Sequence, residues 1–173
     1  MKIVAFISFF IFATISVHSK VFIPFVANGE FDYYVPPNEG CAIISAYLGI
    51  YKLGMKTSNL RDVEECFMQI RKPPYSLLDI TAVLEEFNIN SRALKLRKRE
   101  YIFTSNFAHL IIFLSSPGGN IGHFSFCFRG KDGRYWVADP SYGNKCIEFT
   151  LDSEIFRLFT GIVLVLEKNS DSV

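Results

Sequence analysis

The feature that most constrains the fold is residues 41–51, a stretch that contains no charged residue. At helical spacing its large apolar residues cover most of the circumference of a helix, and small residues fill the remainder. A helix that is apolar on nearly all sides is buried inside its domain. We therefore predict a central buried helix that begins near Asn38 and ends at Leu53, where Gly54 stops it. The large apolar residues are Ile43, Ile44, Tyr47, Leu48, Ile50 and Tyr51.

The remaining pattern divides the chain into a helical half and a strand half. Apolar residues keep helical spacing over residues 60–70, and a second amphipathic helix begins at a capping box made by Ser76 and Asp79. After Asn88 the pattern indicates short strands, with one short helix at residues 151–159 before the last of them. Helices followed by antiparallel strands predict an α+β fold, in which the helical half packs on a C-terminal antiparallel sheet. The predicted strands are residues 109–114, 123–128, 135–138, 145–149 and 162–166, with turns at residues 131–133 and 139–143.

The balance of charge bears on the class of protein. The chain has 173 residues, 18 of them basic and 17 acidic, so its formal net charge is +1. A protein that binds nucleic acid normally carries a marked basic excess, which this chain lacks, so we expect no nucleic-acid partner. The one basic run, Arg97-Lys98-Arg99, has an acidic neighbour and no interleaved aromatic residue, and we predict a solvated face there. The length suits one domain with a hydrophobic core.

The N-terminus has the pattern of an export signal. One basic residue is followed by residues 3–17, which are uncharged but shorter than the ~20 residues that a membrane-spanning helix needs. Val17 and Ser19 are small residues at the positions that a signal peptidase reads before a cut at Lys20. The protein is then periplasmic or secreted. The alternative is an uncleaved helix that tethers it to a membrane. The predicted parts are an export signal at residues 1–19, one domain at residues 20–167 and a short polar tail at residues 168–173.

The four cysteines all lie beyond the expected cleavage site, at Cys41, Cys66, Cys127 and Cys146. An even number of cysteines in an exported protein is compatible with two disulfides. The sequence does not determine their pairing, and only one disulfide is possible if one cysteine is a working nucleophile. No Cys-x-x-Cys pair and no zinc-type spacing of Cys and His occurs, so we expect no structural metal.

Cys41 is the candidate nucleophile because it stands in the first turn of the predicted central helix. Unpaired backbone N–H groups and the helix dipole at that end favour an anion, and so favour the reactive thiolate. The alternative is that Cys41 is a small buried apolar residue, which is a common role for a free cysteine.

A nucleophilic cysteine needs a base, and two histidines lie beyond the expected signal. His123 follows a glycine-rich loop and opens a strand, whereas His109 begins an apolar strand and fits a structural role better. If residues 130–133 turn a hairpin, Asp139 at the end of the next strand comes close to His123. A carboxylate there orients the imidazole and stabilises its charged form. The alternative for Asp139, which precedes Pro140, is the start of a turn.

Three short blocks of sequence contain these candidate residues. They are Asn38-Glu39-Gly40-Cys41, Gly122-His123-Phe124 and Asp139-Pro140-Ser141-Tyr142-Gly143. Their order and spacing resemble those of the bacteriocin-processing, double-glycine leader peptidases. The resemblance implies a papain-like fold and a cofactor-free hydrolysis of peptide bonds, at small residues such as Gly-Gly, in a peptide or protein partner. It also implies that Cys41 is the nucleophile, His123 the general base and acid, and Asp139 the orienting acid.

One departure from the family pattern leaves other functions open. Family members usually carry a Gln shortly before the nucleophile that helps to stabilise the oxyanion, whereas this chain has Val35 there and its only Gln is Gln69. Asn38 is the candidate to replace that donor, and its alternative role is a helix cap. We predict an exported cysteine peptidase. The alternatives are a non-catalytic peptide-binding module on the same fold, and an acyl-transferring or deamidating enzyme with the same Cys–His–Asp site.

Overall fold

The computed structural model describes residues 20–22, 30–32, 40–54, 59–115, 122–139 and 146–169. The export signal, Asn38, the turn after Asp139 and residues 170–173 of the tail lie outside the described residues. Within these ranges no helix has the length and apolar composition to span a bilayer. In chain order the elements are β1 (Lys20–Phe22), β2 (Glu30–Asp32), α1 (Gly40–Lys52), α2 (Leu60–Ile70), α3 (Leu77–Glu86), β3 (Ile89–Lys95), α4 (Tyr101–Thr104), β4 (His109–Leu114), β5 (His123–Arg129), β6 (Tyr135–Ala138), β7 (Ile147–Glu148), α5 (Glu154–Leu158) and β8 (Phe159–Lys168).

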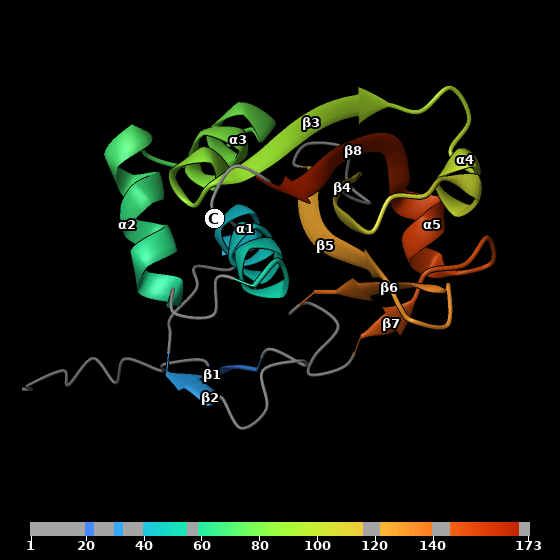
Figure 1. Cartoon of the computed structure of the whole chain (residues 1–173), viewed down its shortest axis with the longest axis horizontal. Helices are drawn as coiled ribbons and strands as arrows, with labels where there is room; N and C mark the ends of the chain where they lie inside the picture. The colour runs from blue at the N-terminus through green and yellow to red at the C-terminus, as the bar shows by residue number, and fades with distance from the viewer. Residues whose placement is uncertain are drawn as a thin grey trace, which may run out of the picture.

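A six-stranded antiparallel sheet in the order β3-β8-β4-β5-β6-β7 forms the centre of the fold (Figure 1). Strands β1 and β2 form a separate antiparallel pair. Alternate residues of the sheet enter two different cores. One core contains α1, α2 and α3, and the other contains residues of α4 and α5. The architecture is therefore the α+β arrangement that the sequence predicted, with the helical half packed on the sheet.

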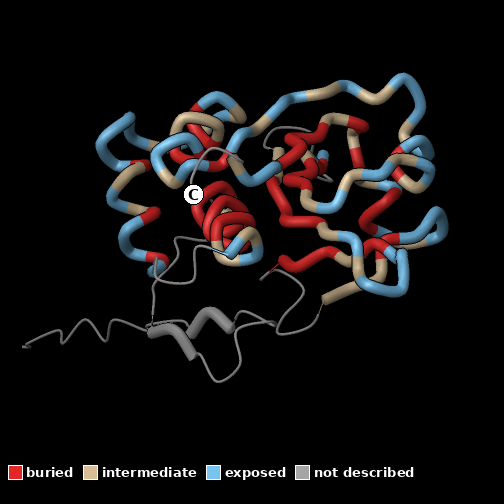
Figure 2. Tube along the Cα trace, in the orientation of Figure 1, coloured by how far each residue is buried: buried red, intermediate tan, exposed pale blue. Residues whose placement is uncertain are grey.

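Helix α1 is buried along most of its length, as its lack of charge predicted (Figure 2). It packs against β5 and β4 on the sheet and against α2 and α3 on its other sides. Gly49 allows a close approach, because a Cβ at this position would lie 2.6 Å from Leu166 Cδ1 on β8. This packing fixes α1 over the sheet, and thereby fixes Cys41 at its N-terminal end.

Helices α2 and α3 both begin at capping boxes. The Ser76 backbone N–H donates to Asp79 Oδ2 at 2.6 Å, and the Asp79 N–H donates to Ser76 Oγ at 3.3 Å. This confirms the capping box predicted for α3. Asn59 and Asp62 make the same reciprocal pair at the start of α2. Each box satisfies backbone N–H groups that have no partner within the helix.

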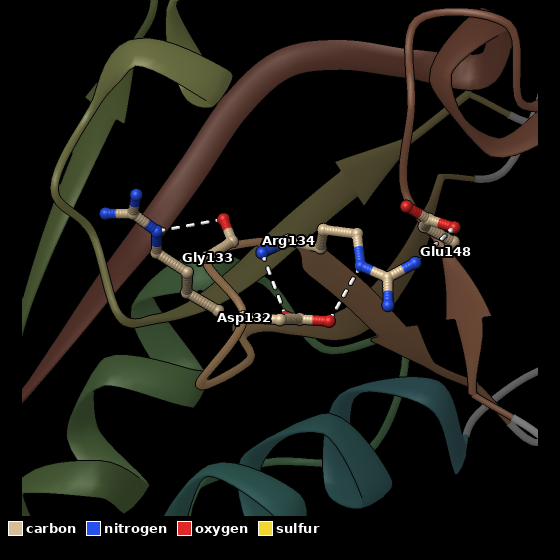
Figure 3. Close-up of polar contacts among 5 residues, drawn as sticks. Asp132, Gly133, Arg134 and Glu148 are labelled. Atoms are coloured by element: carbon tan, nitrogen blue, oxygen red, sulfur yellow. Dashed lines mark hydrogen bonds and ion pairs between the residues drawn. The ribbon is translucent and has the colours of Figure 1, made fainter.

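The β5–β6 hairpin is closed by the turn predicted at residues 131–133 (Figure 3). Gly133 has a φ of 80°, a backbone conformation that favours glycine. Arg134 Nε donates to Asp132 Oδ2 at 2.7 Å, and its Nη1 reaches Glu148 Oε2 on β7 at 3.4 Å. These contacts connect the turn to β6 and β7, and the opposite end of the hairpin carries the candidate site residues.

The largest difference from the prediction is strand β3, which the sequence pattern did not indicate. Strand β3 lies at the edge of the sheet and pairs with β8 over its whole length. Most of its residues are exposed or half-buried, so polar side chains interrupt the apolar alternation that identifies a strand. Asn88, with a φ of 55°, turns the chain from α3 into β3.

The boundaries of the last two elements also differ from the prediction. Helix α5 covers Glu154–Leu158 rather than residues 151–159, because Ser153 caps it and Phe159 already belongs to β8. Strand β8 covers Phe159–Lys168, and so extends beyond residues 162–166 at both ends. Its additional residues pair with β3 and with β4, which are contacts between segments far apart in sequence. Helix α4 was not predicted either.

Arg99 corrects the prediction that the basic run is a solvated face. Its Nη1 donates to the carbonyl oxygens of Phe156, Arg157 and Phe159 at 3.3, 3.3 and 3.0 Å. The guanidinium carbon also lies 5.1 Å from the centroid of the Phe156 ring. Arg99 therefore joins the segment before α4 to the C-terminal end of α5, while its neighbour Arg97 is exposed, as predicted.

Candidate active site

Cys41 is the second residue of α1 and is half-buried. Its side chain packs against the core around α1, which holds it in place while part of it stays accessible. The first turn of a helix presents backbone N–H groups and the positive end of the helix dipole. The structure thus places Cys41 where the sequence predicted, in the first turn of the central helix.

His123 and Asp139 come together at one end of the β5–β6 hairpin. His123 is the first residue of β5, and Asp139 directly follows the last residue of β6. His123 Nε2 lies 2.5 Å from Asp139 Oδ2. The side chain of Asp139 is only 1% exposed, whereas that of His123 is 32% exposed. A buried carboxylate therefore holds one nitrogen of a ring that solvent can still reach.

The environment of His123 favours the protonated imidazole. Burial lowers the pKa of His123, but hydrogen bonds of the ring with Asp139 and Cys41 and the charges of both groups outweigh it and raise that pKa to about 10. Because Nε2 is held by Asp139, the nitrogen that remains for Cys41 is Nδ1. At neutral pH His123 is therefore an imidazolium that contacts the carboxylate of Asp139.

The ring of Phe113 explains why a glycine stands directly before His123. A Cβ at this position would lie 1.9 Å from Cζ of Phe113, so any larger residue would require the ring to move. Phe113 in turn packs against Phe124, with ring centroids 5.1 Å apart. The sequence showed the glycine but not the aromatic ring that requires it, because Phe113 lies on the neighbouring strand β4.

The other candidate histidine lies at the opposite end of the same strands. His109 pairs with Phe128 at the far end of the β4–β5 ladder, whereas Leu114 pairs with His123. Its ring stacks on Phe126, with centroids 6.5 Å apart. Burial and the charge of Lys52 lower the pKa of His109, so it is mostly neutral at pH 7. His109 therefore has the structural environment that the sequence predicted.

The structure also reveals a contact of Asp139 that sequence reasoning missed. Ser125, on β5, donates a hydrogen bond from its Oγ to Asp139 Oδ2. Ser125 is two residues after His123, so the alternation of a strand places both side chains on the same face. That spacing was visible in the sequence, but only the pairing of β5 with β6 shows what Ser125 faces.

All four cysteines of the chain lie among the described residues, and none of them forms a disulfide. Cys127 is completely buried, and burial raises the pKa of its thiol. Burial also raises the pKa of Cys66 and Cys146. These three thiols are therefore poor nucleophiles at neutral pH. Among the described residues no three His, Cys, Asp or Glu side chains gather in a way that could hold a metal ion.

The sequence of the chain matches a known protein family. The model of the peptidase C39 family matches residues 37–171, which is most of the chain. The match includes all three candidate residues, Cys41, His123 and Asp139. No curated protein sequence matches the chain with significance.

Two solved structures show the same fold. The peptidase domain of Streptococcus ComA, a bifunctional ABC transporter involved in a quorum-sensing pathway, is 13% identical with a TM-score of 0.62, over 78% of this chain and 95% of that chain. A double-glycine-motif protease from an AMS/PCAT transporter, in complex with the leader peptide, is 15% identical with a TM-score of 0.58, over 88% of this chain and 96% of that chain. The chain therefore has the papain-like fold of these peptidase domains.

Proposed function

The chain belongs to the peptidase C39 family and is a cysteine peptidase, and we propose that Cys41, His123 and Asp139 carry out its reaction. The observation that supports this proposal most directly is the 2.5 Å contact between His123 Nε2 and the buried carboxylate of Asp139. The interaction of the same ring with the Cys41 side chain, which helps to raise the pKa of His123, also supports it. Membership of a peptidase family favours hydrolysis over the binding-module alternative.

The first half of the reaction forms an acyl-enzyme. The Cys41 thiolate attacks the carbonyl carbon of the scissile peptide bond, and a carbon–sulfur bond forms. The protonated imidazole of His123 gives its proton to the departing amine as the carbon–nitrogen bond breaks. Asp139 holds the ring in place throughout and stabilises its positive charge.

The second half of the reaction releases the acyl group. The imidazole, now neutral, takes a proton from a water molecule, which attacks the thioester carbon. The carbon–sulfur bond breaks, the carboxylic acid product leaves, and the thiolate faces a protonated His123 again. We propose that Asn38, shortly before Cys41 in sequence, donates a hydrogen bond to the oxyanion in both steps.

We propose that the substrate is a peptide or protein that is cut after small residues such as Gly-Gly. The sequence resemblance supports this choice, and one of the two structural neighbours is itself a double-glycine-motif protease in complex with a leader peptide. We further propose that the enzyme is exported, because residues 1–19 have the pattern of a signal peptide.

The decisive experiment measures how fast an alkylating reagent modifies Cys41 as a function of pH, because this requires no knowledge of the substrate. Mass spectrometry assigns the label to Cys41, since Cys66 and Cys146 are also partly accessible. We expect rapid labelling well below the free-thiol pKa of ~8.5, and a change in rate as His123 loses its proton near pH 10. In His123→Ala the rate at neutral pH falls at least about tenfold, since each unit of pKa shift changes the thiolate fraction by that factor.

The matched control is His109→Ala, which removes a histidine from the other end of the same strands. This variant keeps the labelling rate and the pH profile of the wild type. Identical profiles in the wild type and in His123→Ala would disprove the proposed ion pair. Cleavage of a peptide library by the wild type, but not by Cys41→Ala, then identifies the residues at the cut.

A further inference from the structure

Ser125 is a buried polar residue that the reaction described above does not use. It lies on β5 and is 1% exposed. The register of β5 against β6 pairs Phe126 with Ala138, and its continuation by one residue places Ser125 opposite Asp139. The chain thus puts a hydroxyl inside the sheet, directly across from the carboxylate of the candidate site.

The hydroxyl of Ser125 and the ring of His123 meet at the same oxygen atom. Ser125 Oγ donates to Asp139 Oδ2, and His123 Nε2 contacts that oxygen at 2.5 Å. A carboxylate that is almost fully removed from water needs donors to remain charged, and two donors on one oxygen also resist rotation of the carboxylate. The geometry fixes which oxygen of Asp139 faces His123.

We propose that Ser125 is a positioning residue that holds Asp139 Oδ2 toward His123. Ser125 does not touch the substrate. It acts through Asp139, which acts through His123 on the Cys41 thiolate, and its catalytic role therefore rests on the proposed function. An apolar residue at position 125 would remove one of the donors that hold this buried oxygen toward His123.

The first part of the test observes the hydrogen bond itself. In NMR spectra a ring N–H proton that donates to a carboxylate over a short distance resonates far downfield, and the His123→Ala variant identifies this signal by its loss. We expect the signal in the wild type and in Ser125→Thr, which keeps the hydroxyl. In Ser125→Ala we expect the signal to move upfield or to disappear through exchange with water.

The second part of the test measures the alkylation rate of Cys41 in the same variants. A hydrogen bond to a charged group corresponds to roughly a ten- to hundredfold change in an equilibrium, and we expect a loss of that order in Ser125→Ala at neutral pH. Ser125→Thr should recover most of the rate. Ser105→Ala is the matched control, because the Ser105 hydroxyl also makes hydrogen bonds, to Ile102 and Tyr135, at the other end of β6.

Each outcome decides one of the two proposals. An unchanged His123 signal in Ser125→Ala, whatever the labelling rate, overturns the positioning role. An equal loss of signal in Ser105→Ala also overturns it, because the effect would then reflect general destabilisation. If the signal responds to Ser125 but labelling of Cys41 never depends on His123, the proposed function fails while the positioning role stands.

Discussion

At the scale of single residues, Phe113 on β4 limits which residue can stand directly before His123 on β5. The ring of Phe113 occupies the space that a side chain at position 122 would need. The same ring packs on Phe124, immediately after His123. The backbone on both sides of His123 is therefore held by one aromatic residue, and this restricts the position of the imidazole.

Gly122→Ala should therefore destabilise the protein and disturb the site. Overpacking of this kind typically costs about 1–3 kcal/mol, and we expect a decrease of that order in the free energy of unfolding, measured by urea denaturation. The labelling rate of Cys41 should fall with it, because His123 moves. In a Phe113→Ala background the ring is absent, so the same substitution should cost much less. Equal losses in both backgrounds would show that the ring is not the cause.

The residues of the site differ in how far sequence could predict them. Cys41 was predicted from its place in the first turn of an uncharged helix, and His123 and Asp139 from the hairpin that brings their strands together; the catalytic roles of all three stay predictions. Ser125 and Phe113 were not identified, because their importance lies in contacts across neighbouring strands rather than in their own spacing. Asn38 lies outside the described residues and stays a prediction.

At the scale of elements, the C-terminal end of α5 depends on a residue from a distant segment. Carbonyl groups at the end of a helix have no partner within the helix, and Arg99 supplies donors to three of the carbonyls around this end. Helix α5 has only one and a half turns and directly precedes β8, which is a central strand of the sheet. Arg99 therefore stabilises a junction on which the sheet depends.

Arg99→Ala should lower the free energy of unfolding by about 1.5–3 kcal/mol, the range for hydrogen bonds to a charged group. The measurement is the midpoint of urea denaturation, with the slope of the transition unchanged. Arg97→Ala removes an equal charge from the same basic run at an exposed position, and should change stability by no more than about 0.5 kcal/mol. The explanation would be wrong if the two variants lost the same stability.

The elements that sequence predicted well are those whose pattern is set by burial. Helix α1 was predicted from its lack of charge. Strand β4 covers the residues predicted for it, because most of its side chains are buried and therefore apolar. Strand β3 was missed because it is an edge strand, where one side of the ladder is open and polar residues are tolerated. The length of β8 depends on its pairing with β3 and β4. Both strands are distant in sequence, so the residues of β8 alone do not indicate where it ends.

At the scale of the whole molecule, the proposed export makes a prediction about the mature chain. Secreted protein should begin at Lys20, and N-terminal sequencing or intact mass measures this directly. Replacement of Ser19 by a large residue should impair the cut, since a small residue is needed there, while replacement of Ser16 should not. A protein found only in membranes, with residues 1–19 still attached, would support the tethered alternative instead.

The sequence separation of the site residues has a consequence for when reactivity arises. His123 and Asp139 are 16 residues apart and meet within one hairpin, which closes at a small cost in chain entropy. Cys41 belongs to a helix far earlier in the chain and joins them only when α1 packs against β5. Contacts between residues far apart in sequence require longer loops to close, and proteins rich in such contacts fold more slowly. The contact between His123 and Asp139 is thus a local product of folding, whereas the proposed site with Cys41 exists only in the completed molecule.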